Sequence, residues 1–421
     1  RSGDNMQKLT IPTDSMEIME EDIVEIEKAL RCGDVTIFGS QLLNNFEDKF
    51  SRFLGNLNNI SMPNCTSALF IALQLLELKE GDEVIVQNLT HASAILPILH
   101  LKNINIKICD FSSKSYDLDI NALLNLITSN TKAIIVSYLQ GYPINIQEIE
   151  KICNEKGIKL IEDTAQGLGV KIANQKAGTF GDYGCFSFGA NKLLKLGEGG
   201  SLTYKKDEEK DKINQFRHVG EVWKTSKNST VSNNSSYENI LHNGFDYIEH
   251  GFNFRFTPIN FALGLRSIST MDEIIDTRQK KLELYKSILK DTVGLDLISE
   301  RIDETAPLSA WYVLDSELFN LNKVIIKAIE YGIPVGRFKY PLISETEGFK
   351  EYIVNSSEKF ENASHIRNNS LFLPLYENIS LDNVKEIAEC IKNILENYNE
   401  ICIDESLLKS DISYFNGFFL K

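Results

Sequence analysis

The stretch from Ile161 to Gly200 carries side chains whose types and spacing could do chemistry. An apolar run ends in two carboxylates, the second of which is Asp163, and the next short apolar run contains Ser187. Lys192 follows five residues after Ser187 and precedes a cluster of glycines. An acid, a hydroxyl and an amine near two strand ends could surround a small cofactor with a cationic ring nitrogen, a phosphate and an aldehyde.

Those three groups together describe pyridoxal phosphate (PLP). A PLP enzyme needs a lysine that holds the aldehyde as a Schiff base and later moves a proton. Most of the 44 basic residues should lie on the solvated surface, but Lys192 stands between a strand that ends in FSF and the sequence GEGG. Lys195 is the alternative, and the spacing from Ser187 favours Lys192.

Asp163 follows the apolar run KLIE, so we expect it at a buried strand end. A carboxylate that faces a pyridine nitrogen keeps that nitrogen protonated and strengthens the electron sink. The alternative role is a helix-capping residue before Thr164. The nearby Lys192 favours the cofactor role.

Two groups earlier in the chain could complete such a site. Thr66 and Ser67, in NCTSAL, open a predicted apolar helix, where free N–H groups and hydroxyls can hold a phosphate, and a capping role is compatible with this. His91 opens the next predicted helix, as a plain helix-start residue, a metal ligand or a flat ring stacked on a cofactor. Because no second His or Cys lies at ligand spacing, metal binding is disfavoured. The chain also lacks GxGxxG, P-loop and GxSxG motifs.

Short apolar runs alternate with helical stretches through the first half of the chain. Predicted strands are Glu83–Gln87, Asn105–Cys109, Ala133–Tyr138 and Ile158–Glu162, and predicted helices are Thr66–Leu78, His91–Leu101, Leu118–Ile127 and Ile146–Asn154. This alternation predicts an α/β fold, with a mostly parallel central sheet flanked by helices. Ligands bind beyond the carboxyl ends of such strands, so Asp163 and Ser187 should face one ligand.

The second half of the chain has a different pattern. The Ser- and Asn-rich segment Glu221–Asn243 predicts a long surface loop, and Pro258–Leu289 predicts a long helix. The following residues mix shorter elements, with strands Ala310–Leu314 and Pro334–Arg337 and helices Asn320–Tyr331 and Leu381–Leu395. We expect an N-terminal helix with a large cofactor-binding domain (1–290), a small α+β domain (291–400) and a C-terminal tail (401–421).

Composition limits the possible functions. The 421 residues are 43% hydrophobic and 24% charged, as in globular enzymes, and the net charge of −15 argues against nucleic-acid binding. Seven scattered cysteines without a CxxC pair argue against a disulfide framework or a zinc site. No apolar run approaches the roughly 20 residues that span a bilayer, and RSGDNMQKLT lacks the apolar core of a secretory signal. We expect a cytoplasmic protein without a membrane partner.

Seven motifs in order resemble the DegT-type PLP-dependent sugar aminotransferases, which share the aspartate aminotransferase fold (fold type I). They span most of the chain and read NCTSALFIAL, GDEVIVQNLTHASA, GYP, IEDTAQGLG, FSFGANKLLKLGEGG, GFNFRFTPINFALG and LFLPLY. In this resemblance Lys192 matches the Schiff-base lysine and Asp163 the partner of the pyridine nitrogen. Gln166 matches the residue near the phenolic oxygen, and Ser187 matches a phosphate ligand.

The resemblance also implies a shared site. Thr66 and Ser67 match the phosphate contacts at a helix start, and Asn253 matches an asparagine that reaches the cofactor phosphate of a neighbouring subunit, which implies a two-fold homodimer. The chain departs from the family at His91, where a Phe, Tyr or Trp usually stacks on the ring, and near Tyr138, where a histidine is often found.

The resemblance implies an aminotransferase that acts on a keto-sugar linked to a nucleotide, with glutamate as donor, in amino-sugar, polysaccharide or secondary-metabolite biosynthesis. Candidate groups for the sugar phosphates are Arg217, His218, Arg255, Arg337 and Lys339. One alternative is a dehydratase of the same fold. The resemblance implies that sugar 3-dehydratases have a histidine at the position of Lys192, so the lysine favours transfer. The other alternative is a non-catalytic PLP-binding protein.

Overall fold

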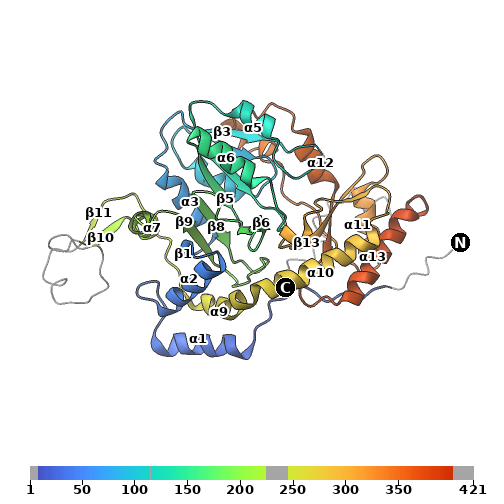
Figure 1. Cartoon of the computed structure of the whole chain (residues 1–421), viewed down its shortest axis with the longest axis horizontal. Helices are drawn as coiled ribbons and strands as arrows, with labels where there is room; N and C mark the ends of the chain where they lie inside the picture. The colour runs from blue at the N-terminus through green and yellow to red at the C-terminus, as the bar shows by residue number, and fades with distance from the viewer. Residues whose placement is uncertain (1–7, 114, 224–244, 402–421) are drawn as a thin grey trace.

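A seven-stranded sheet forms the centre of the protein (Figure 1), whose computed structural model describes residues 8–113, 115–223 and 245–401. In spatial order its strands are β1 (Asn58–Met62), β9 (Gly200–Tyr204), β8 (Tyr183–Ser187), β5 (Lys159–Asp163), β4 (Thr131–Ser137), β2 (Glu83–Gln87) and β3 (Asn105–Cys109). Pairing is parallel from β8 to β3, and β9 is antiparallel to both of its neighbours. The predicted α/β fold with a mostly parallel sheet is confirmed.

The strands of this large sheet are buried because helices cover them. All five residues of β2 are buried, as expected for a parallel strand that is covered on both faces. Helix α3 (Cys65–Leu75) packs against β5, β8 and β9, α6 (Ile146–Lys156) against β5, and α5 (Ile120–Leu126) against β3. The core therefore lies between the large sheet and its flanking helices.

The parallel strands bring several polar residues to one edge of the sheet. Asp163 ends β5, Ser137 ends β4 and Ser187 ends β8, and Ser137 and Asp163 are partners in the register of the two strands. Two short strands, β6 (Lys171–Ile172) and β7 (Gln175–Lys176), lie between β5 and β8 along the chain. This edge is where a ligand site is expected in such a sheet.

A second, antiparallel sheet organises the C-terminal part, which we call the small-sheet body. It contains β12 (Leu295–Leu297), β13 (Ser309–Leu314) and β14 (Ser370–Pro374), with α11 (Leu321–Glu330), α12 (Glu361–Asn369) and α13 (Leu381–Glu396). The long helix α10 (Met271–Leu289) packs against α13 (Figure 1). The Tyr285 hydroxyl on α10 also donates to the Pro374 carbonyl at 3.0 Å.

The N-terminal segment, residues 8–19, connects the two parts of the molecule. Leu9 donates its N–H to the Tyr331 carbonyl of the small-sheet body at 2.8 Å. The segment leads into α1 (Glu20–Cys32), which packs against α9 (Ala262–Ser267) and is followed by α2 (Gln41–Phe53). Buried Asp22 on α1 pairs with Arg266 on α9 at 2.9 Å.

Two segments that were predicted as single helices are each divided into shorter ones. The segment 258–289 is divided into η2 (Ile259–Phe261), α9, η3 (Ile268–Thr270) and α10. The segment 91–101 forms only η1 (Ala92–Ala94) and the single turn α4 (Leu96–Leu99), because Pro97 has no N–H to donate to a longer helix.

Two other segments differ from the prediction. Of the predicted strand 334–337, only Gly336 forms a bridge, with Phe372. The predicted loop 221–243 begins with strand β10 (Glu221–Trp223), paired with β11 (Phe245–Tyr247), and its remainder lies outside the described residues, as does the tail from 402.

The remaining elements are α7 (Glu209–Arg217), η4 (Ile302–Glu304), η5 (Ile343–Glu345), η6 (Lys350–Tyr352) and η7 (Tyr398–Glu400). Within the described ranges, no helix is long and apolar enough to cross a bilayer.

Candidate active site

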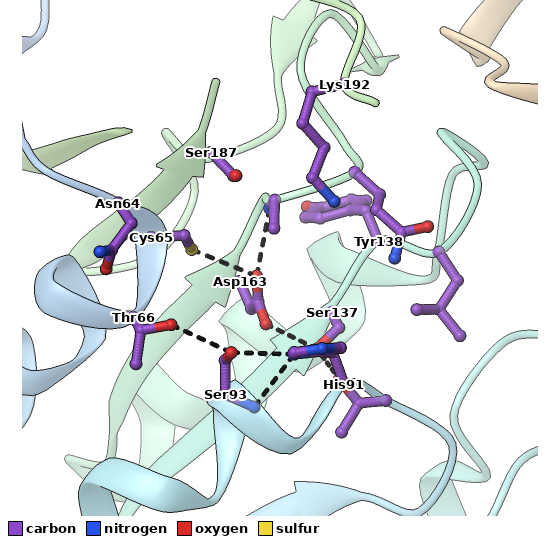
Figure 2. A pocket seen from close by; sticks show the side chains of 14 residues that line it. Asn64, Cys65, Thr66, His91, Ser93, Ser137, Tyr138, Asp163, Ser187 and Lys192 are labelled. Carbon is purple, nitrogen blue, oxygen red and sulfur yellow. Dashed lines mark hydrogen bonds between the residues drawn. The ribbon is translucent and has the colours of Figure 1, made fainter. Parts of the chain in front are cut away.

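One cavity opens at the carboxyl edge of the large sheet (Figure 2). It is lined by Asn64, Cys65, Thr66, Thr90, His91, Ser93, Ser137, Tyr138, Leu139, Asp163, Ala165, Gln166, Ser187 and Lys192. Six of the eight residues predicted for the site line it, namely Thr66, His91, Asp163, Gln166, Ser187 and Lys192. The other two, Ser67 and Asn253, do not.

Asp163 lies at the floor of the cavity and is 4% exposed. Its Oδ1 accepts the Ala165 N–H at 3.1 Å, and the Cys65 thiol and the Ser137 hydroxyl are each 3.5 Å from one of its oxygens. Burial raises the pKa of this carboxyl, and the nearby Lys192 charge acts in the opposite direction. In the described part of the chain no cation forms an ion pair with it, so the carboxylate lacks the positive partner that a buried charge requires.

Lys192 follows β8 and extends its amine into the same cavity (Figure 2). Burial lowers the pKa of this amine, while the charge of Asp163 acts to raise it. A lysine with a lowered pKa is more often neutral and therefore more nucleophilic. Lys195 lies elsewhere, because its amine bonds to Asp14 and lies 3.7 Å from Glu377.

Gln166 lines the cavity three residues after Asp163. Its Oε1 accepts the backbone N–H of Gln140 at 2.9 Å, so the amide oxygen is directed away from the cavity. The NH₂ group is the donor end of the amide, and it lies near the hydroxyl of Tyr340. An amide in this orientation can donate to a phenolic oxygen.

The start of helix α3 brings hydroxyl groups to the cavity. Asn64 caps the helix by accepting the N–H of Ser67 and also the Ser67 hydroxyl, each at 2.9 Å. The Ser67 side chain is therefore turned toward Asn64 and lies outside the cavity lining. Thr66 lines the cavity with Ser187, and these two hydroxyls together with the helix N-terminus could hold an anion.

His91 lies at the mouth of the cavity and caps the short helix η1. Its Nδ1 accepts the Ser93 backbone N–H at 3.2 Å and is 2.8 Å from the Ser93 hydroxyl, which in turn accepts from Thr66 at 3.0 Å. Because the backbone N–H must donate, Nδ1 carries no proton in this arrangement and the neutral ring has its proton on Nε2. Desolvation lowers the pKa of His91, and the charge of Asp163 acts in the opposite direction.

The sequence reasoning did not assign site roles to several lining residues. Ser93 and Asn64 were inside the quoted motifs, and the position of Asn64 directly before a helix was a signal for capping. Ser137 could have been inferred from its place at the end of a predicted strand. Tyr138 lines the cavity near the position where the family often has histidine, and its hydroxyl donates to buried Glu162 at 2.6 Å.

The residues proposed for sugar phosphates are not gathered in this cavity. Arg217 is half-buried and donates to the Ser61 carbonyl of β1 at 2.8 Å, and Arg337 bonds to Asn322 at a separate surface hollow. Asn253 is exposed and forms a bridge with His218. Arg255 contacts His218 Nδ1 at 2.9 Å.

The side chains that line the cavity match the chemical groups of PLP. The buried carboxylate of Asp163 needs a cation, which a protonated pyridine nitrogen would provide. Lys192 would hold the aldehyde carbon, Gln166 would donate to the phenolic oxygen, and Ser187 with Thr66 would hold the phosphate. His91 would lie against a face of the ring.

Comparison with known proteins agrees with this geometry. Residues 16–392 match the family model of the DegT/DnrJ/EryC1/StrS aminotransferase family, and the chain belongs to this family. It is therefore a PLP-dependent aminotransferase. A GDP-perosamine synthase from Vibrio cholerae is 26% identical over 83% of this chain and 90% of its own length.

Solved structures show the same fold. PseC from Helicobacter pylori, an aminotransferase involved in pseudoaminic acid biosynthesis, has a TM-score of 0.81 at 20% identity, covering 92% of this chain and all of its own. The E. coli GDP-4-keto-6-deoxy-D-mannose-3-dehydratase with bound hydrated PLP has a TM-score of 0.80 at 22% identity, covering 91% of this chain and all of its own.

Proposed function

We propose that this protein transfers an amino group from glutamate to the ketone of a nucleotide-linked sugar in amino-sugar biosynthesis. The observation that carries the proposal is the convergence of Lys192, Asp163 and Gln166 on one cavity at the carboxyl edge of the large sheet. Bound PLP supplies an electron sink for the negative charge that develops at the carbon bearing the amino group. A sugar as substrate follows from membership of the family, and the nucleotide is suggested by the GDP-perosamine synthase relative.

Lys192 is the group that moves the proton. Its amine enters the cavity without a hydrogen-bond or ion-pair partner among the described residues, so its Nζ is available to a substrate carbon. Burial lowers its pKa and favours the neutral form that accepts a proton. Asp163 lies in the same cavity, where its negative charge would keep the ring nitrogen protonated.

A homodimer with shared sites is part of the proposal. Asn253 is exposed and lies outside the lining of its own chain's cavity, and the family resemblance gives the matching asparagine to a neighbouring site. Arg255, two residues further on, is also exposed and could reach a substrate phosphate there. Lys339 remains a candidate on its own chain, because the ring of adjacent Tyr340 lies 6.1 Å from that of His91.

A cytoplasmic location is also proposed. Six cysteines lie in the described ranges and each is a free thiol, which suits a reducing compartment. Five of them are buried, and the thiol of Cys65 lies directly against Asp163.

The absorbance of the PLP-loaded protein tests the proposal. Glutamate should convert the band of the lysine-bound cofactor to that of the amine form, and no conversion with any amino donor would contradict aminotransfer. Lys192→Ala should abolish the band. Lys195→Ala is the matched control and should retain it, because Lys195 bonds to Asp14 outside the cavity lining.

Product analysis separates aminotransfer from dehydration. The alternative function is suggested by the fold shared with GDP-4-keto-6-deoxy-D-mannose-3-dehydratase. With glutamate and GDP-4-keto-6-deoxy-D-mannose or another nucleotide-linked keto-sugar, a transferase product gains an amino nitrogen, and a dehydratase product loses a hydroxyl oxygen. The resemblance implies a histidine at the position of Lys192 in sugar 3-dehydratases. Lys192 therefore favours the product that gains an amino nitrogen.

A further inference from the structure

The amide of Gln166 is oriented by a residue outside the cavity lining. Its Oε1 accepts the backbone N–H of Gln140 at 2.9 Å and lies 3.4 Å from the Gln140 side-chain nitrogen. Because a backbone N–H can only donate, the Gln166 atom that faces it must be the amide oxygen. The NH₂ group is the donor end of this cavity-lining amide, and it lies beside the buried hydroxyl of Tyr340, whose pKa it acts to lower.

Gln140 is itself oriented by the small-sheet body. Its Oε1 accepts the hydroxyl of Ser309, the first residue of β13, at 2.8 Å. The Gln140 oxygen therefore faces Ser309 and its nitrogen faces Gln166. The three side chains form one directed series of hydrogen bonds from the small-sheet body to the cavity.

The backbone at Gln140 is held in an uncommon conformation. Its φ is +54°, in the left-handed region that residues other than glycine adopt only at a cost. Its carbonyl accepts the Leu308 N–H at 2.9 Å, and the Gly141 carbonyl accepts the Ala306 N–H at 2.8 Å. These contacts hold the turn in place and direct the Gln140 N–H toward Gln166.

We propose that the side-chain amide of Gln140, held by Ser309, is a positioning group that, with the Gln140 backbone N–H, fixes the Gln166 NH₂ group as a donor toward the phenolic oxygen of the cofactor. This inference rests on the role proposed above for Gln166. A donor at that oxygen favours its deprotonated form. The Gln140–Gln166 pair therefore lowers the pKa that the absorbance of the bound cofactor reports.

An absorbance titration of the PLP-loaded enzyme measures this pKa without turnover. Gln140→Met keeps the side-chain length and the backbone N–H and removes the amide, so the loss of the 3.4 Å hydrogen bond to Gln166 should raise the pKa by up to about half a unit. Ser309→Ala removes only the hydroxyl that orients Gln140, so it should raise the pKa of the bound cofactor by less than Gln140→Met does. The control is Gln41→Met, at an exposed glutamine on α2, which should leave the pKa unchanged.

Gln166→Met distinguishes the positioning role of Gln140 from the cofactor contact proposed for Gln166. If Gln166→Met does not raise the pKa, the proposed role of Gln166 is wrong and the inference falls with it. If Gln166→Met raises the pKa and Gln140→Met does not, only the positioning role is overturned. Because Gln140 acts through Gln166, the double variant should shift no further than Gln166→Met alone, and an additive shift would overturn the inference. If Gln140→Met loses the cofactor, Ser309→Ala decides by the same criterion.

Discussion

The hydroxyl of Tyr138 donates a 2.6 Å hydrogen bond to the buried carboxylate of Glu162, the residue immediately before Asp163. The same carboxylate accepts the backbone N–H groups of Gly178, Phe180 and Gly181 at 2.7 to 2.8 Å. Glu162 therefore fixes the connection between β5 and β8 behind the cavity. Asp163 and Lys192, on either side of that connection, depend on it for their positions.

Removing the Tyr138 hydroxyl should destabilise the fold. Tyr138→Phe leaves a buried carboxylate with one donor fewer, and we expect the free energy of unfolding to fall by about 1–3 kcal/mol. Urea denaturation of the cofactor-free protein measures this. Tyr352→Phe, at an exposed tyrosine, is the control, and an equal loss in both variants would show that the buried hydrogen bond is not the cause.

Asp163→Asn should reduce activity without a loss of fold. Burial raises the pKa of Asp163 above its ordinary 3.8, so ionisation costs stability as the pH rises through the folded-state pKa. The cofactor-free Asn variant should therefore gain stability relative to wild type between acid and neutral pH. Its rate of amino transfer should fall by about two orders of magnitude, because the ring nitrogen loses its anionic partner. A stability difference that does not change with pH would argue against a buried charge.

Ser93 should keep the His91 ring neutral. The Ser93 hydroxyl is 2.8 Å from Nδ1, and donation to that nitrogen opposes protonation. Burial is the main cause of the lowered pKa of His91, and loss of the additional donor in Ser93→Ala should raise that pKa part of the way back, as measured by NMR titration of the ring C–H signals, with His91→Phe to assign them. Since the folded-state pKa lies below 6.5, the contribution of His91 to stability is present above pH 6.5 and is lost as the pH falls. A pKa that stays constant in Ser93→Ala would refute this.

Asn253 should act on the site of the other subunit. Lys192→Ala and Asn253→Ala should each reduce activity when purified alone. If the subunits exchange randomly in an equal mixture, half of the dimers are mixed and one of their two sites is intact, so activity should recover to about a quarter of wild type. Recovery would be absent if Asn253 served its own chain, and size-exclusion chromatography would show whether dimers form.

The sequence predicted the sheet well where burial alone decides the structure. Strands β2 and β3 have the predicted bounds because they are short apolar runs between turn residues. The segment 258–289 was predicted as one helix because its apolar spacing continues. Its two main parts have different partners, α1 and α2 for α9 and α13 for α10, with a 3₁₀ turn between them.

The candidate site was predictable only in part for a similar reason. Asp163, Ser187 and Lys192 have local signals, since strand ends and glycine clusters can be read from neighbouring residues. Gln140 has none, because its partner Ser309 is 169 residues away along the chain. Ser67 was predicted for the cavity, but its hydroxyl bonds to Asn64, which lines the cavity in its place.

The contacts of residues 8–19 have a consequence for how the protein unfolds. Leu9 bonds to the small-sheet body, Asp14 bonds to Lys195 of the large part, and Asp22 in the following helix pairs with Arg266. Neither part can therefore separate from the other without also breaking these contacts. We expect the large and small parts to melt in one cooperative transition, so calorimetry should give a single peak whose van't Hoff and calorimetric enthalpies agree.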